Sequence, residues 1–178
     1  MNKEILIIYK SVTGFTAQYA RYLAAELDCT AEDLKTAPAM ELCGYKTLIY
    51  GGRFHAGFVD GLKEAKALFR RSGAERFIVF ATGATPATEL EMIEAAWRNN
   101  FTQEELAAIA HFYLPGGLRY EKMPLGDRLM MRAFAAMVKH KKEKSEYERT
   151  MAQAVGRSYD ISSKEYIRPL VDCVRQRS

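Results

Sequence analysis

The chain has 178 residues, of which 48% are hydrophobic and 27% charged, and its formal net charge at pH 7 is +4. This composition is typical of a soluble globular protein, and it excludes collagen, coiled coils and disordered tails. The length favours one domain, and no apolar run approaches the ~18 residues that a membrane-spanning helix needs.

The cysteines indicate the redox compartment. Cys29, Cys43 and Cys173 are scattered and odd in number, and no pair has the C-x-x-C spacing of a zinc site. This pattern favours a reducing compartment, so we expect a cytoplasmic protein without a metal site. The first apolar run has five residues before Lys10, which is too short for a signal peptide and predicts a strand.

The positive charge is concentrated in one segment. From Arg119 to Arg149 there are nine Lys and Arg residues against five Asp and Glu residues, so the rest of the chain is neutral. Between Arg128 and Lys144, six basic residues accompany the single acid Glu143. Such a segment indicates either a surface for anionic partners or a solvated helix face. Nucleic acid is not expected, because no recognised nucleic-acid-binding module is present.

Predicted strands and helices alternate along the chain. Apolar runs predict strands at residues 4–9, 29–34, 46–50, 76–81 and 109–114. Helical spacing predicts helices at residues 14–27, 58–69, 90–97 and 167–174, and Thr102 with Glu105 forms a possible capping box for a short helix. The last helix has Ser162 or Ser163 as its candidate cap. This alternation predicts a single α/β domain built on a doubly wound parallel sheet.

Residues 124–161 form an additional segment. Residues 124–144 predict an amphipathic helix, and residues 145–161 stay ambiguous between helix and loop. One side of the predicted helix carries the basic residues and the other carries methionine and phenylalanine. The basic stripe comprises Arg128, Arg132, Ala135, Lys139 and Lys142, and the opposite stripe Met130, Phe134 and Met137. The pattern fits peripheral contact with the inner face of an anionic membrane, or packing on the domain.

Three hydroxyl groups and a glycine follow the first strand. Ser11, Thr13, Gly14 and Thr16 lead into the first helix, where ligands bind in doubly wound sheets. Hydroxyl donors at a helix N-terminus suit a phosphate. The loop is neither a Walker A loop nor a G-x-G-x-x-G fingerprint. The alternative is a Ser/Thr helix cap without a ligand.

A family resemblance rests on this loop. The stretch from Ile7 to Leu23, IIYKSVTGFTAQYARYL, resembles the flavodoxin signature with its S-x-T-G-x-T phosphate loop. The resemblance implies a flavodoxin-like five-stranded parallel sheet of order 2-1-3-4-5, with the basic amphipathic helix as an addition near the C-terminus. It also implies that the chain binds FMN. The residues it assigns to the FMN phosphate are Ser11, Thr13, Gly14, Phe15 and Thr16.

Two further loops resemble the flavin-binding loops of this family. The stretch after the third predicted strand implies cofactor contacts from Gly52, Arg53, Phe54, His55, Ala56 and Gly57, with Phe54, His55 and Phe58 as candidate walls of the ring site. After the fourth strand, Thr82, Gly83, Ala84 and Thr85 offer small residues whose amides suit the polar edge of the ring. No aromatic residue follows before Trp97, so we expect one face of the ring to be open.

A second resemblance concerns the additional segment. G-x-L-R-Y at residues 116–120 and D-R-L-M-M at residues 127–131 resemble the flavodoxin-type, menaquinone-dependent protoporphyrinogen oxidases of bacteria. It implies oxidation of the tetrapyrrole protoporphyrinogen IX through FMN to a quinone. Arg53, Arg119 and His55 are candidate substrate contacts, because two positive charges suit propionates and an imidazole can move protons. Two alternatives stay open: an electron carrier that docks with redox partner proteins, and a flavin-free interaction module.

Overall fold

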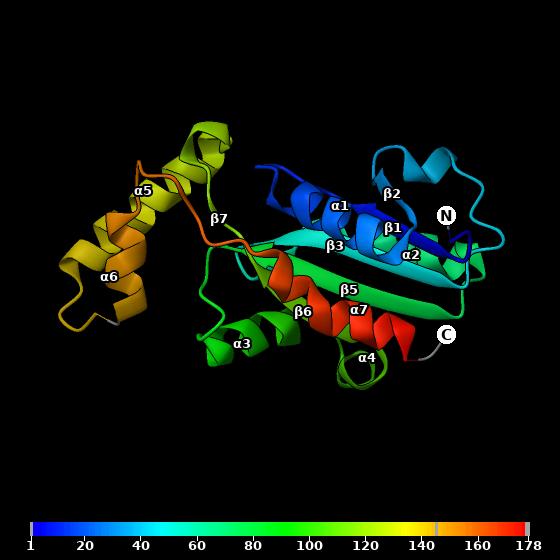
Figure 1. Cartoon of the computed structure of the whole chain (residues 1–178). Coiled ribbons are helices and arrows are strands. Elements are labelled where there is room, and N and C mark those ends of the chain that lie inside the picture. Colours follow the sequence, from blue (N-terminus) through cyan, green and yellow to red (C-terminus); the bar gives the residue numbers. More distant parts are fainter. Residues whose placement is uncertain (1, 145, 177–178) are drawn as a thin grey trace. The chain divides into compact units, whose positions relative to one another are not determined.

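The computed structural model describes residues 2–144 and 146–176 (Figure 1). The chain forms two compact units, of which the first comprises Met1–Gly116 and Ile161–Ser178 and the second comprises Gly117–Asp160. The second unit covers nearly the same residues as the additional segment at 124–161.

A parallel sheet forms the centre of the first unit. Its strands are β1 (Ile5–Tyr9), β2 (Thr30–Asp33), β3 (Thr47–His55), β5 (Arg76–Gly83) and β6 (Ala110–Pro115). They are arranged in the order β2-β1-β3-β5-β6, and each neighbouring pair is parallel. The predicted α/β fold and the order 2-1-3-4-5 are therefore confirmed. The carboxyl ends of all five strands lie at one edge, and the order reverses between β1 and β3, where doubly wound proteins bind ligands.

Helices cover both faces of this sheet (Figure 1). On one face lie α1 (Phe15–Leu27) and α7 (Arg168–Arg175), the latter preceded by the 3-10 turn η3 (Lys164–Ile167). On the other face lie α2 (Leu62–Ser72), α3 (Leu90–Asn100) and α4 (Gln103–Ala108), together with the 3-10 turn η1 (Ala37–Ala39). Each central strand therefore buries both sides, which explains its continuous apolar run.

Successive side chains of each strand point to opposite faces of the sheet, so they contribute to two separate cores. Ile7 and Ile49 pack toward α1 and α7, whereas Ile8 and Tyr50 pack toward α2 and α3, and all four are fully buried. The predicted stripe of the last helix is buried against the first of these cores, and Ser163 accepts a hydrogen bond from the Glu165 amide at the start of η3. The predicted stripe is confirmed, whereas Ser163 caps the turn η3, and α7 itself begins after Ile167 without a side-chain cap.

The capping box is also confirmed. The Thr102 hydroxyl accepts a hydrogen bond from the Glu105 amide, and the Glu105 carboxylate accepts one from the Thr102 amide. Two amide groups that the helix itself leaves unpaired are thereby satisfied. This arrangement fixes the start of α4.

One predicted helix start is wrong. The spacing of Phe58, Leu62, Ala65 and Phe69 predicts a helix from residue 58, but α2 begins at Leu62. Phe58 belongs instead to β4 (Phe58–Val59), a short strand antiparallel to β3. Its backbone groups are used in that pairing, and its side chain is 58% exposed. The helical spacing of Phe58 is therefore coincidental.

The third strand is longer than predicted. It continues past Tyr50 through Gly51 and Gly52 to His55. A Cβ at Gly51 would lie 2.1 Å from the Phe80 ring, and one at Gly52 would lie 2.6 Å from Val59. These glycines therefore lie inside the strand because neighbouring side chains occupy the space beside them, rather than marking its end.

The second unit is a pair of helices closed by a short ribbon. It contains β7 (Gly117–Leu118), the turn η2 (Tyr120–Lys122), α5 (Leu125–His140), α6 (Glu146–Gln153) and β8 (Tyr159–Asp160). Strands β7 and β8 pair antiparallel, and α5 packs on α6. The amphipathic helix predicted at 124–144 is α5, which ends at His140. In the ambiguous segment, the structure forms α6 and β8, while Ser145 lies outside the described residues.

Within residues 2–144 and 146–176, no helix combines the length and the apolar character that crossing a membrane requires.

Candidate functional site

The loop between β1 and α1 presents a buried polar atom. The Ser11 Oγ atom is buried and has no hydrogen-bond partner among the described residues. Buried hydroxyl groups in proteins nearly always have partners, because leaving one unsatisfied costs about 1–3 kcal/mol. Ser11 therefore points to a partner that the chain itself does not supply.

The start of α1 is suited to an anion. Gly14 is the N-cap residue and adopts a left-handed conformation with φ of 97°, and as a glycine it offers no capping side chain. Its carbonyl accepts the first helical hydrogen bond from the Gln18 amide at 3.0 Å. The amide groups of the first turn carry the partial positive charge of the helix end. Together with Ser11, this end of α1 has the donors that a phosphate requires.

A buried hydroxyl pair joins the first and third predicted loops. Thr16 Oγ1 lies 2.8 Å from Thr82 Oγ1, and the two residues are 1% and 2% exposed. In such a pair one hydroxyl donates and the other accepts, so the accepting hydroxyl keeps its own proton for a further bond. Two residues assigned to the cofactor site are thus brought together, by a contact that the sequence did not indicate.

Phe15 anchors the loop to the first unit's core. It is 4% exposed, and a Cβ at Gly116 would lie 2.9 Å from its ring. The side chain is therefore used in packing, which leaves the Phe15 backbone as the part suited to a ligand. Thr13, in the same loop, is half-buried.

The second predicted loop is a β-hairpin. Gly52, Arg53, Phe54 and His55 lie in β3, and Ala56 and Gly57 form the turn to β4 with φ of 50° and 84°. Positive φ at both central residues is the mark of a type I′ turn, whose twist matches that of the paired strands. His55 pairs directly with Phe58 across the hairpin. These residues are therefore placed by strand pairing and not by a free loop.

An ion pair fixes the base of the hairpin. Arg53 Nε donates to Asp60 Oδ2 at 2.7 Å, and the two side chains are 18% and 21% exposed. The Tyr50 hydroxyl donates to the Asp60 carbonyl, and burial raises the pKa of Tyr50, which keeps this donor protonated. The sequence offered Arg53 as a substrate contact, but its guanidinium is already engaged with a carboxylate.

Asn100 holds the tip of the hairpin, and sequence reasoning missed it. Its amide nitrogen donates to the Gly57 carbonyl at 2.9 Å, and its Oδ1 accepts from the Val59 amide at 2.8 Å. Asn100 is the last residue of α3, far from the hairpin in sequence. Only its polar character next to the apolar Trp97 face would have suggested a role.

Tyr113 was also missed. Phe54, a predicted ring wall, packs edge-on against Trp97 at 4.9 Å and stacks on Tyr113 at 5.9 Å. The Tyr113 hydroxyl donates to the Thr85 carbonyl at 2.7 Å, and it lies where a Cβ at Gly83 would clash, at 2.8 Å. Tyr113 therefore organises the third predicted loop, at Gly83–Thr85. Its place at the carboxyl end of the fifth parallel strand was the available indication.

The candidate site thus gathers three groups at one edge of the sheet. Strand register places Tyr9 beside Gly51, and Arg53 beside Thr82, so the three following segments start from adjacent strands. A cavity of about 310 Å³ borders the hairpin at Phe58, Val59 and Asn100, and two larger cavities lie elsewhere. One of about 680 Å³ includes Arg76, Phe77 and Ala110, at the opposite ends of β5 and β6.

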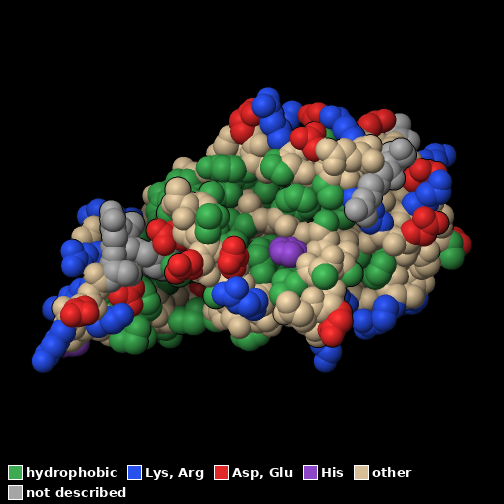
Figure 2. Space-filling model, turned by 90° about the horizontal axis from the view of Figure 1, so that it is seen from below, with side chains coloured by type: hydrophobic (Ala, Val, Ile, Leu, Met, Phe, Trp, Pro, Cys, Tyr) green, Lys and Arg blue, Asp and Glu red, His purple; other side chains and the backbone are tan. Residues whose placement is uncertain are grey.

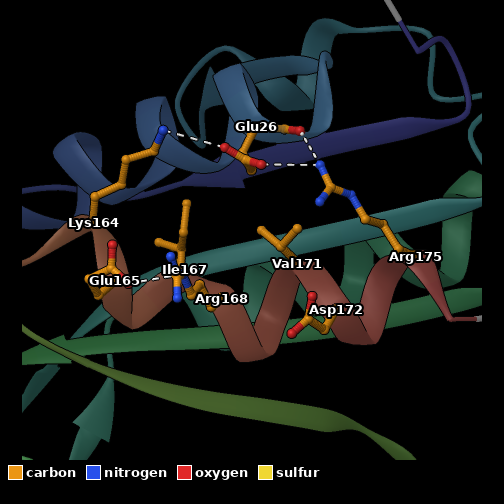
Figure 3. Close-up of a pocket in the computed structure, with 8 residues that line it drawn as sticks. All are labelled: Glu26, Lys164, Glu165, Ile167, Arg168, Val171, Asp172 and Arg175. Carbon is orange, nitrogen blue, oxygen red and sulfur yellow. Dashed lines mark hydrogen bonds and ion pairs between the residues drawn. The ribbon is translucent and has the colours of Figure 1, made fainter.

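Another cavity, of about 430 Å³, lies between α1 and the η3–α7 segment (Figure 3). Lys164 and Arg175 both reach Glu26, at 3.3 and 3.2 Å, while Ile167 and Val171 form its apolar floor. Hydrogen bonds from these two bases, Lys164 first, lower the pKa of the Glu26 carboxyl. Both bases are therefore engaged by Glu26, and this cluster attaches α7 to α1.

The family model described as "Flavodoxin domain" matches residues 6–145, which is most of the chain. The chain belongs to this flavodoxin domain family. Members of the family bind flavin, generally FMN. The match includes the loop between β1 and α1 and helix α5 of the second unit. No curated protein sequence matches the chain.

Solved structures of flavodoxin-like proteins resemble the chain at low identity. A putative flavoprotein from Bacteroides uniformis ATCC 8492 is 18% identical, with 65% of this chain and 92% of that chain covered and a TM-score of 0.45. A flavodoxin from the domain Archaea is 12% identical, with 61% and 83% covered and a TM-score of 0.41. The Trp repressor binding protein from Bacillus subtilis is 14% identical, with 63% and 84% covered and a TM-score of 0.42.

The hydroxyl pair makes a prediction about stability. We expect Thr16→Val or Thr82→Val to lower the free energy of unfolding by about 1–3 kcal/mol, because each leaves the other hydroxyl buried without its partner. The double variant removes both polar groups, so its loss should be smaller than the sum of the single losses. Urea unfolding of the four proteins measures this coupling. Strictly additive losses would contradict the pair.

The Glu26 cluster predicts a pH dependence. A carboxyl whose pKa is lowered on folding stabilises the fold above its unfolded pKa and loses that contribution as the pH falls through its folded value. We expect Glu26→Gln to lower the melting temperature slightly at pH 7, with the difference disappearing in acid. Glu94→Gln, in an exposed pair within α3, is the control. A difference from wild type that persists undiminished at acidic pH would refute the assignment.

Proposed function

We propose that the chain is an FMN-binding redox protein whose cofactor phosphate binds in the loop between β1 and α1. The observation that carries this proposal is the buried Ser11 Oγ, which has no partner within the described part of the chain. The uncapped start of α1 at Gly14 supplies the rest of the anion site. These donors fit a phosphate, so the residues present are compatible with the cofactor that the family generally binds.

Each part of the site has a separate task. The hydroxyls of Ser11 and Thr13 and the amides of Gly14, Phe15 and Thr16 would hold the phosphate, with the Thr16–Thr82 bond keeping the helix start in place. The hairpin residues at 52–57 and the segment Gly83–Thr85 would position the ring. When bound, FMN supplies one- and two-electron transfer, so the protein needs no acid, base or nucleophile of its own for the redox step.

A finer assignment follows from the second unit. We assign the reaction to the protoporphyrinogen dehydrogenase (quinone) type, in which an apolar reductant is oxidised and a quinone is reduced. Support comes from the resemblance at residues 116–120 and 127–131 and from the apolar surface of α5, where Leu125 and Leu129 are 76% and 63% exposed. Such a surface suits partners that partition into lipid. An electron carrier is the alternative.

The arginines offered for substrate carboxylates are occupied. Arg53 pairs with Asp60, and Arg119 Nη2 lies 3.2 Å from Asp160 Oδ2. A propionate group would have to replace one of these carboxylates. We therefore propose no arginine contact for the substrate. His55 stays a candidate substrate contact, and its position at the end of β3 is the reason.

The phosphate assignment predicts the affinity for FMN. We expect the double variant Ser11→Ala, Thr13→Val to raise the Kd at least tenfold, since a hydrogen bond to a charged group contributes about 1.5–3 kcal/mol. Thr47→Val is the matched control, because Thr47 is the first residue of β3 and lies at the edge of the sheet opposite to the candidate site. Titration with FMN, followed by quenching of flavin fluorescence, gives both values. Equal affinity in wild type and double variant would refute the assignment.

The reaction type predicts turnover. We expect the FMN-loaded protein, incubated anaerobically with protoporphyrinogen IX and a water-soluble menaquinone analogue, to form fluorescent porphyrin faster than buffer with free FMN. The quinone should be consumed in step. If the protein binds FMN but forms porphyrin only at the background rate, the oxidase assignment fails and the electron carrier remains as the proposed function.

A further inference from the structure

Helix α5 exposes an apolar face. Leu125, Leu129, Met130 and Met137 are 76%, 63%, 45% and 59% exposed. At 100° per residue they fall, with the exposed Ala133 and Ala136 between them, within one continuous arc of the helix. Val138 lies on the other side and is 2% exposed. The sequence had left open whether the methionines are core, but Met130 and Met137 face outward.

An apolar arc of this kind marks an interaction site. Single exposed hydrophobic residues are ordinary, but a contiguous group of large ones is typical of a surface that meets a protein or a membrane. The family match extends across α5 to residue 145, so this helix belongs to the stretch that the domain model covers. The charge of the residues beside the apolar arc then indicates whether a protein or a membrane fits this surface.

Basic residues lie beside the apolar arc and just beyond the end of α5. Arg132 and Lys139 on the helix, and Lys142 after it, are exposed and form no ion pair within the part of the chain that the structure describes. Lys141 is different, because its Nζ lies 2.8 Å from Glu148. The second unit has ten Lys and Arg residues against six Asp and Glu residues, which accounts for the whole net charge of +4. Figure 2 shows blue side chains gathered around the end of this unit where α5 leads toward α6.

We propose that α5 binds the surface of an anionic lipid bilayer. Its apolar arc would enter the boundary between head groups and acyl chains, and Arg132, Lys139 and Lys142 would lie at the level of the lipid phosphates. Long basic side chains suit this position, because their stems are apolar and their charged ends stay in water. The proposal goes beyond the redox function and does not depend on FMN.

Charge complementarity favours lipid over a second copy of the chain. Two α5 faces brought together would place Arg132 and Lys139 of both copies around one apolar contact, and like charges so placed repel. An anionic bilayer attracts the same residues, and each basic side chain near it adds to binding. Binding should therefore require acidic lipid and weaken with salt.

The experiment is co-sedimentation of the full chain with vesicles. We expect the protein to sediment with phosphatidylcholine vesicles containing 30% phosphatidylglycerol, to bind pure phosphatidylcholine at least tenfold less, and to be largely released at 0.5 M NaCl. Leu129→Glu with Met137→Glu should lower the partition coefficient more than tenfold, and Arg132→Glu with Lys139→Glu should do the same. Circular dichroism checks that each variant is folded.

Matched controls lie in the first unit. Lys35→Glu with Lys63→Glu makes the same charge change at exposed positions, and Leu90→Glu replaces a residue that is 64% exposed. Both should keep binding within about threefold of wild type. Depth is measured with Met137→Trp, whose fluorescence brominated lipids should quench, whereas the buried Trp97 of wild type should be unaffected.

Three results would overturn the proposal. These are equal binding to acidic and neutral vesicles, an equal loss in the control variants, and no binding to either vesicle. Sedimentation equilibrium completes the test: a dimer that Leu129→Glu with Met137→Glu dissociates, with no vesicle binding, would assign the face to a second copy instead.

Discussion

The hydrogen bond between Thr16 and Thr82 joins the two halves of the candidate site. In the sheet, β3 lies between β1 and β5, so this bond connects the start of α1 to the end of β5 across the carboxyl end of β3. It is possible only because Thr82 has the side-chain orientation of Ile78 and Phe80, toward α1. The parallel register therefore determines where the helix end, and with it the proposed phosphate site, can lie.

The remaining site residues are positioned by elements that do not belong to the site themselves. Asn100 of α3 holds the hairpin tip, Asp60 holds its base through Arg53, and Tyr113 of β6 holds the segment after β5. Each uses a polar group to fix backbone at the same edge of the sheet. A site built on hydrogen bonds from rigid helices and strands is preorganised, which lowers the conformational cost of binding a ligand.

Much of this architecture could be predicted from the sequence, for a physical reason. The central parallel strands are buried on both faces, so each leaves a continuous apolar run, and the candidate phosphate loop has its hydroxyls at local spacing. The hairpin could not be predicted, because Gly51-Gly52 looks like a strand end unless Phe80 and Val59 are known to lie beside it. Nor could the roles of Asn100 and Tyr113, since their partners are distant in sequence. Helical periodicity likewise grouped Met130 and Met137 but could not decide whether anything covers them.

The two units use polar chemistry in different ways. At the candidate phosphate site the donors are hydroxyls and backbone amides, and the nearby Arg53 is neutralised by Asp60, so recognition depends on geometry. In the second unit, Arg119 and Lys141 are paired with carboxylates, whereas Arg132 and Lys139 are exposed beside the apolar arc of α5. Charge there acts at longer range and is sensitive to salt, whereas hydrogen bonds at the loop are not screened in the same way. Salt should therefore separate the two functions, weakening attachment to lipid while affecting the cofactor site far less.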